Sequence, residues 1–146
     1  MTLQSANHVK RFGITPKAAL LSHSNFGSAN DDDAKKMSSA VSILHEKHPQ
    51  LEVEGEIQAD AALLENLRKG VINDSKLNGE ANLFIFPNLD AANISFNMVR
   101  ILSDGVTIGP ILLGLEKPVH VLKPFASVRR ILNMTALCSA EQGEVS

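Results

Sequence analysis

With 146 residues, of which 44% are hydrophobic and 21% charged, the chain has the size and composition of one globular domain or of part of one. A formal net charge of -2 and an aromatic content of 4% exclude a broad nucleic-acid-binding surface, which needs excess cations and stacking rings. One cysteine excludes an internal disulfide, no apolar run reaches membrane length, and the polar start of the chain lacks the apolar core of a signal peptide. We therefore expect a cytoplasmic protein with no nucleic-acid partner and no membrane partner.

The first predicted elements are a helix end at Gly13, a short buried strand at 17–22 and a loop of small polar residues at 23–28. Ser28 or Asn30 is predicted to cap the next helix, whose inward stripe is Ala34, Met37, Val41 and Leu44. Free hydroxyls and a glycine between a strand and a helix suit a phosphate or a carboxylate. Three aspartates follow at 31–33 and no Walker-type lysine is present, so an ordinary capped loop is the alternative.

Residues 51–57 alternate between apolar side chains and glutamates. Leu51, Val53 and Ile57 are predicted on one face, and the glutamates at 52, 54 and 56 on the other. Three glutamates on one face are compatible with a metal site, but a half-exposed edge strand is favoured because charge on an edge also blocks aggregation. The next prediction is a helix at 60–69 with Leu63 and Leu67 inward.

The run at 83–86 predicts a strand buried on both faces and ended by Pro87. A helix then begins near Asn88 or Asp90, with an apolar stripe of Leu89, Ala92, Phe96 and Val99 and a polar stripe of Asp90, Asn93 and Asn97. A further buried strand is predicted at 106–108, after Gly105. The polar stripe begins where a parallel strand ends, which is where ligands usually bind; a solvated helix face is the equal alternative.

A last strand is predicted at 119–122, and Ser127 is predicted to cap a final helix with Val128, Ile131, Leu132 and Thr135 inward. Arg129 and Arg130 in its first turn oppose the helix dipole, which indicates either a bound anion or two solvated side chains. No Cys/His metal spacing is present. The alternation of strands and helices predicts an α/β fold, in three α/β/α layers with a mostly parallel sheet.

Two segments, ALLSHSNFGS at 19–28 and ANLFIFPNLDAANISFN…GVTIGPILLGLEKPVHVL across 81–122, resemble the phosphate acetyl/butyryltransferase family, and EGEIQADAALLENLR at 54–68 is similar to the segment between them. The resemblance covers nearly the whole chain and about the C-terminal half of the family's module, whose two lobes flank an acyl-CoA cleft. It implies that residues 1–146 are a single phosphotransacetylase-like domain cut from a larger chain.

The sequences at 9–14, 22–28, 87–93 and 127–135 read more specifically like the C-terminal phosphotransacetylase-like domain of bacterial NADP-dependent malic enzymes. The active transferases carry a serine and an arginine after a Lys-Pro-Val run and use an aspartate downstream. Here the corresponding positions hold Lys123, Pro124 and Arg130. The resemblance therefore implies acyl-CoA binding without transferase chemistry, and no catalytic residue in this chain.

From this resemblance we expect a regulatory and oligomerisation domain that binds acetyl-CoA, or a related acyl-CoA, as allosteric effector. Malate decarboxylation, with its NADP and its Mg or Mn ion, would belong to an upstream domain, and this chain would hold no cofactor and no metal. An active phosphate acetyltransferase and a purely structural module are the alternatives, and a homo-oligomer, at least a dimer, is expected. The candidate ligand residues are Lys123, Arg129 and Arg130 for the phosphates, and Ser24, Asn25, Ser28, Asp90 and Asn93 for the acyl part.

Overall fold

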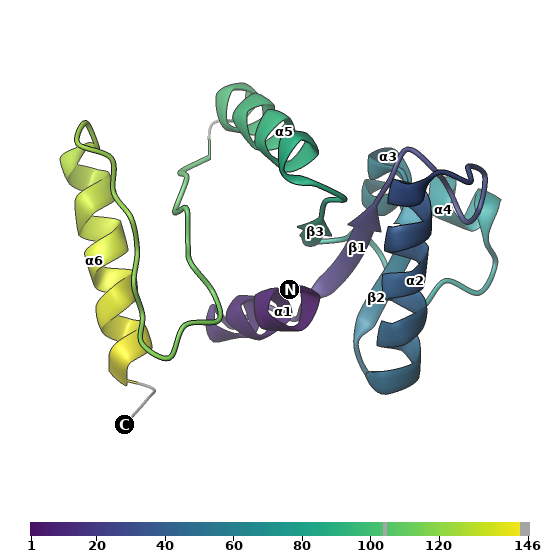
Figure 1. Ribbon diagram of the computed structural model, residues 1–146, viewed down its shortest axis with the longest axis horizontal. Coiled ribbons are helices and arrows are strands. Elements are labelled where there is room, and N and C mark those ends of the chain that lie inside the picture. The colour runs from purple at the N-terminus through teal and green to yellow at the C-terminus, as the bar shows by residue number, and fades with distance from the viewer. Residues whose placement is uncertain (104, 144–146) are drawn as a thin grey trace. The chain divides into compact units, whose positions relative to one another are not determined.

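A sheet of three parallel strands organises residues 1–98, the first of two units into which the chain divides; the second comprises residues 99–146. The computed structural model describes residues 1–103 and 105–143. Strand β1 (Lys17–Leu21) lies between β2 (Glu52–Ile57) and β3 (Leu83–Ile85) (Figure 1). After its first residue β1 consists only of alanine and leucine, all buried, and such a strand needs cover on both faces.

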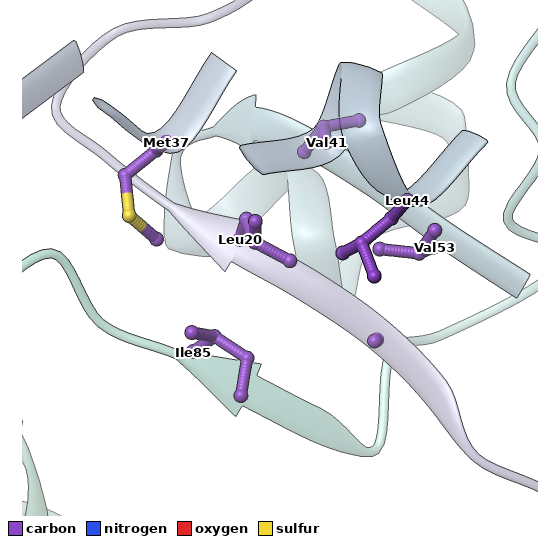
Figure 2. Packing of buried hydrophobic residues seen from close by; sticks show 7 residues of the cluster. Leu20, Met37, Val41, Leu44, Val53 and Ile85 are labelled. Carbon is purple, nitrogen blue, oxygen red and sulfur yellow. The ribbon is translucent and has the colours of Figure 1, made fainter. Parts of the chain in front are cut away.

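Helices α1 (Thr2–Arg11) and α2 (Asp32–Lys47) cover one face of this sheet. The core on this side contains Ala18, Leu20, Met37, Val41, Leu44, Val53 and Ile85, with Leu3 of α1 packed against it. Figure 2 shows the α2 side chains lying over Leu20 of β1. The predicted inward stripe of α2 is confirmed, since all four of its residues are buried.

The opposite face of the sheet is covered by α3 (Ala59–Leu63) and by the segment at 77–81. Its core contains Ala19, Leu21, Ile57, Ala62, Leu77 and Ala81. Because successive residues of β1 alternate between the two cores, neither face is left to solvent. The predicted three-layer α/β/α arrangement around a parallel sheet is confirmed.

A bulge in β2 overturns the predicted alternation at 51–57. Leu20 pairs with Gly55, but Leu21 pairs with Ile57, so Glu56 is an extra residue opposite no partner. The insertion moves Ile57 to the face opposite Val53. β2 does lie at the edge of the sheet, yet Glu54 and Glu56 are only 3% and 2% exposed, so the prediction of an exposed glutamate face is wrong.

The helix predicted at 60–69 is two short helices, α3 and α4 (Glu65–Val71), joined at Leu64. Leu63 and Leu67 are 44% and 46% exposed, so the prediction that they face inward is wrong. Arg68 is fully buried instead. The break at Leu64 changes which residues of α4 face the interior. The guanidinium of Arg68 donates to four acceptors there.

The strand predicted at 83–86 and the helix after it are present as β3 and α5 (Leu89–Leu102). Among the residues described, only β1 pairs with β3, so Leu83 and Phe84 are half-buried rather than buried on both faces. Helix α5 contains the boundary between the two units. The residues of the predicted apolar stripe lie on this helix, and none of them is buried.

The second unit contains helix α6 (Val128–Gly143) and the segment before it. Neither 106–108 nor 119–122 forms a strand, so both predictions are wrong; a strand needs a hydrogen-bonded neighbour, and residues 105–127 have none among the residues described. Val128, Ile131, Leu132 and Thr135 are exposed rather than inward, whereas Met134 is buried. No helix in the described parts of the chain is long and apolar enough to cross a membrane.

Candidate functional site

The candidate site of the first unit lies at the carboxyl ends of β1 and β3. The chain leaves β1 into the β1–α2 loop and leaves β3 at Pro87 and Asn88, and ligands of parallel sheets bind at the carboxyl ends of the strands. The two connections meet through Asn88, whose Nδ2 donates to Oδ2 of Asp33 at 3.0 Å. Asn88 Oδ1 also accepts from the N–H of Ala91, which confirms one of the two predicted caps of α5.

The β1–α2 loop, residues 22–31, closes on itself through its serines. Ser24 Oγ donates to Glu56 at 2.8 Å and accepts from the N–H of Ala29 at 3.0 Å, and no surface of Ser24 is exposed. Ser28 Oγ accepts from the N–H of Asn25 at 2.8 Å. Ser24 therefore shapes the loop from inside, while Asn25 and Ser28 lie at its surface.

The backbone N–H groups of residues 24–29 all donate within the protein. A phosphate cradle needs several such groups free and pointing at the anion. The loop therefore has the hydrogen bonding of an ordinary closed loop, the alternative that the sequence left open.

The start of α2 is acidic. Asp31, rather than the predicted Ser28 or Asn30, caps it by accepting from the N–H groups of Asp33 and Ala34, and the Ala34 bond is the main cause of the lowered pKa of Asp31. His23 Nε2 lies 3.1 Å from Asp31 Oδ2. A hydrogen bond from Lys36, and then one from Asn88, lowers the pKa of Asp33. These ionised carboxylates disfavour a phosphate at this helix end.

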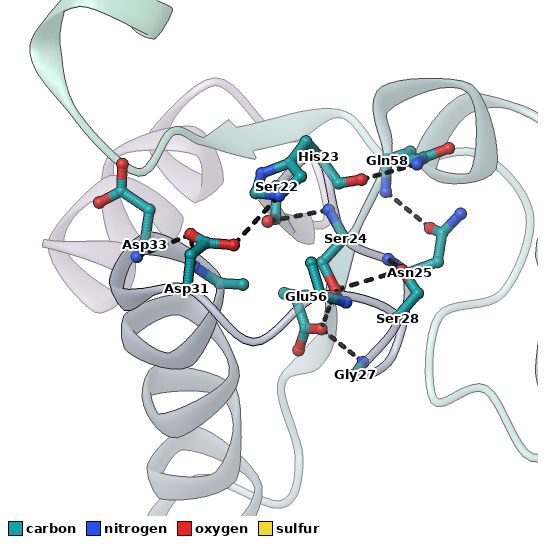
Figure 3. Close-up of polar contacts among 12 residues, drawn as sticks. Ser22, His23, Ser24, Asn25, Gly27, Ser28, Asp31, Asp33, Glu56 and Gln58 are labelled. Carbon is teal, nitrogen blue, oxygen red and sulfur yellow. Dashed lines mark hydrogen bonds and ion pairs between the residues drawn. The ribbon is translucent and has the colours of Figure 1, made fainter.

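Glu56 is the residue that sequence reasoning missed. Its carboxylate is buried behind the β1–α2 loop, where Oε1 accepts from Ser24 Oγ and from the N–H of Gly27 at 2.6 Å (Figure 3). Burial raises its pKa, but the bonds from Gly27 and Ser24 outweigh burial, and the pKa is lowered below its ordinary value. The available signal was Gly55, since an isolated glycine in a strand often marks a bulge.

The polar stripe of α5 is present in the structure. Asp90 and Asn93 are exposed, and Asn97 Nδ2 donates to the carbonyl and to the side-chain oxygen of Asn93, both at 2.9 Å. Asp90 lies two residues after Asn88, the residue that bonds Asp33. The side chains available to a ligand here are small and polar or acidic.

The predicted cations belong to the second unit, at the start of α6. Ser127 Oγ accepts from the N–H of Arg130 at 3.3 Å, which confirms the predicted cap. Arg130 Nη2 donates to the carbonyl of Gly109, whereas Lys123 and Arg129 are exposed. Among the three, Lys123 and Arg129 are thus the cations open to a ligand.

The rest of the second unit is fixed by contacts along α6. His120 Nε2 lies 2.9 Å from Glu141 Oε2, and both side chains are more than nine-tenths buried. Cys138 Sγ reaches the carbonyl of Pro118 at 3.5 Å, a packing contact. Across residues 1–103 and 105–143, no three His, Cys, Asp or Glu side chains gather as metal ligands would.

The chain is similar along almost its whole length to proteins of one family. The phosphate acetyl/butaryl transferase family matches residues 1–139. The chain belongs to this family. It is 51% identical over 142 residues to the NADP-dependent malic enzyme of Escherichia coli K12, and 51% identical over 140 residues to the NAD-dependent malic enzyme of Rhizobium meliloti. It is 38% identical over 141 residues to the phosphate acetyltransferase of Bacillus subtilis.

These matches cover 97%, 96% and 97% of the chain, but only 19%, 18% and 44% of the respective relatives. The fold agrees as well: a phosphotransacetylase from Streptococcus pyogenes superposes with a TM-score of 0.91 at 35% identity, over 98% of this chain and 44% of that one. The chain thus spans about a fifth of the malic enzymes and less than half of the transferases that it matches.

Proposed function

We propose that this chain is the phosphotransacetylase-like C-terminal region of a malic enzyme, and that it binds acetyl-CoA as a regulatory ligand without turning it over. The higher identity to malic enzymes, 51% against 38% for the Bacillus subtilis transferase, supports this proposal. By the resemblance to the family, Lys123 and Pro124 take the places of the serine and the arginine of active transferases, which supports binding without acyl transfer.

Each unit, taken by itself, offers groups that suit one chemical part of acetyl-CoA. Acetyl-CoA carries several phosphate charges at one end and an uncharged thioester at the other. The first unit offers the polar side chains of Asn25, Ser28 and Asn93, and its ionised Asp31 and Asp33 disfavour a phosphate but not an uncharged acyl group. Lys123 and Arg129 are exposed cations at the start of α6, where the helix dipole also favours an anion, and they suit the phosphates.

We predict that Arg129→Glu in the full-length protein weakens acetyl-CoA binding about tenfold or more, because a charge-assisted contact is replaced by repulsion. Acetyl-CoA control of malate turnover should weaken in parallel. Arg129 is a cleaner target than Arg130, whose contact with Gly109 also supports the fold of its own unit. Titration calorimetry at fixed ionic strength measures the change.

The matched control is Lys47→Glu, which reverses an exposed cation at the far end of α2 from the β1–α2 loop. It changes the net charge equally and should leave the affinity unaltered. Equal affinities for wild type and Arg129→Glu would show that the start of α6 is only a solvated helix end.

An active phosphate acetyltransferase is the second candidate, supported by the matches to transferases over 97% of the chain. The missing serine and arginine lead us to predict no acetyl-CoA formation from acetyl phosphate and CoA above the uncatalysed rate. The full-length protein should be assayed in parallel with an authentic phosphate acetyltransferase as positive control. Turnover at an ordinary enzymatic rate would replace our proposal with this candidate.

The oligomeric role belongs to the same proposal. Exposed large apolar side chains gather in the second unit, where Leu102, Val106, Val121 and Phe125 are each more than half exposed. Burying such side chains stabilises an association by roughly 25 cal/mol per Å² of apolar surface. We therefore propose a homo-oligomer, at least a dimer, in the cytoplasm, with NADP and the Mg or Mn ion held by an upstream catalytic domain.

A further inference from the structure

We infer that Glu56 is a positioning residue that, with Gln58, holds the β1–α2 loop in the shape in which Asn25 and Ser28 meet the acyl end of the ligand. The inference rests on the proposed function and adds to it the residues that build the acyl side of the site. Neither residue needs to touch the ligand, because both act on the loop from the end of β2.

The contacts of Glu56 span the centre of the loop. One carboxylate oxygen accepts from Ser24 Oγ at 2.8 Å and from the N–H of Gly27 at 2.6 Å. The backbone carbonyl of Glu56 accepts from the N–H of Phe26 at 2.9 Å. Three loop residues are therefore tied to one residue of β2, as Figure 3 shows for Ser24 and Gly27.

Gln58 ties down two further residues of the loop. Its Nε2 donates to the carbonyl of His23 at 2.7 Å, and its backbone N–H donates to Oδ1 of Asn25 at 2.8 Å. The second bond fixes the side chain of Asn25, so that Nδ2 is the group of this amide left to face a ligand. Gln58 thus orients one of the residues proposed to contact the acyl group.

The loop needs this support because two successive residues occupy the left-handed region. Phe26 has a φ of 47° and Gly27 a φ of 85°. Glycine adopts such angles freely, but a bulky residue such as phenylalanine does so only when its surroundings hold it there. The Phe26 ring packs against the core that contains Ile57, and its N–H is held by Glu56.

The bulge in β2 allows the side chain of Glu56 to reach the β1–α2 loop. Since Leu21 pairs with Ile57, Glu56 is freed from the regular alternation of the strand and its carboxylate reaches the loop instead of solvent. An ionised carboxylate is a stronger acceptor than a neutral group, and burial keeps water from competing for it. A loop fixed in advance loses little conformational freedom when a ligand binds, which favours affinity.

The test compares the ligand-free and ligand-bound full-length protein. In Glu56→Ala, we expect faster hydrogen exchange of the amides at 24–29 without ligand, and about tenfold weaker acetyl-CoA binding by calorimetry. Glu56→Gln keeps an oxygen acceptor of the same shape and should restore most of the protection and of the affinity. Such rescue would show that the oxygen acceptor, rather than the negative charge, holds the loop.

Glu54→Ala is the matched control. Glu54 is a buried glutamate of the same strand, but its Oε2 accepts from the N–H of Lys76 at 2.8 Å, away from the loop. This variant should lose stability while keeping both the exchange protection of residues 24–29 and the affinity. An equal loss of affinity in Glu54→Ala and Glu56→Ala would overturn the positioning role.

The outcomes separate this inference from the proposed function. Unchanged exchange at 24–29 in Glu56→Ala, or faster exchange with unchanged affinity, overturns the positioning role while acetyl-CoA binding stands. Failure of the wild type to bind acetyl-CoA overturns the proposed function, and with it the ligand that the loop was inferred to meet.

Discussion

Arg68→Ala should lower the free energy of unfolding by about 3–5 kcal/mol, because it leaves several buried acceptors without a donor and opens a cavity. The guanidinium has no exposed surface and donates to the carbonyls of Ala61, Leu77 and Gly79 at 2.9, 3.0 and 2.6 Å. Its Nε donates to Ser75 Oγ at 3.1 Å. The side chain therefore joins α3 to the 75–79 segment, and urea unfolding followed by circular dichroism measures its contribution.

Two further variants show whether the loss of stability comes from the hydrogen bonds of the Arg68 guanidinium. Lys69→Ala removes an exposed neighbour paired with Glu65 at 3.0 Å, and should cost no more than about 0.5 kcal/mol. Arg68→Lys keeps the charge but cannot reproduce the planar fork, so it should remain strongly destabilising. A loss for Arg68→Ala as small as that for Lys69→Ala would mean that the 75–79 segment is held by other contacts.

Gly55→Ala should destabilise the chain by about 2–4 kcal/mol through steric overlap and backbone strain. A Cβ on Gly55 would lie 2.6 Å from the backbone oxygen of Leu20 and 3.2 Å from a methyl of Val41, and the φ of Gly55 is +148°. The oxygen belongs to β1, the central strand, so it cannot move aside without breaking the ladder. Thermal unfolding of the variant should show a lowered midpoint.

Gly70→Ala is the control, and it is expected to change the stability of the chain in the opposite direction. Gly70 lies within α4, has no neighbour within 4 Å of an added Cβ and carries no positive φ. Alanine should stabilise the helix there by roughly 0.5–1 kcal/mol. If Gly55→Ala were neutral or stabilising like Gly70→Ala, the bulge would tolerate a side chain and the close approach of β2 to β1 would not need glycine.

The sequence by itself determined the elements whose signals are local. The period of Ala34, Met37, Val41 and Leu44 located α2 and its inward face correctly. Residue type and position predicted the cap at Ser127 and limited the cap of α5 to Asn88 or Asp90, because a cap depends on groups within one helical turn. The small polar residues at 23–28 likewise indicated a loop at the carboxyl end of a buried strand, which the structure shows.

Local sequence patterns did not predict which polar residues are buried. Alternation predicted that Glu54 and Glu56 face solvent, but their burial depends on donors at Lys76 and in the β1–α2 loop, 20 or more residues away in sequence. Leucine spacing likewise predicted Leu63 and Leu67 inward, whereas Arg68 is buried by carbonyls of other segments. A charged group can be buried only where hydrogen-bonding partners from other segments surround it, and the spacing of residues in the sequence does not show which segments come together.

Strand formation and the inner structure of the loop were also decided by the fold. Apolar runs at 106–108 and 119–122 have strand composition, yet a strand exists only beside a hydrogen-bonded neighbour. Ser24 was predicted among the ligand residues from its type alone, whereas the structure buries it against Glu56. The sequence thus located the loop. Only the tertiary structure decided which groups of the loop face outward, because their orientation depends on Glu56, which a bulge in another strand places behind the loop.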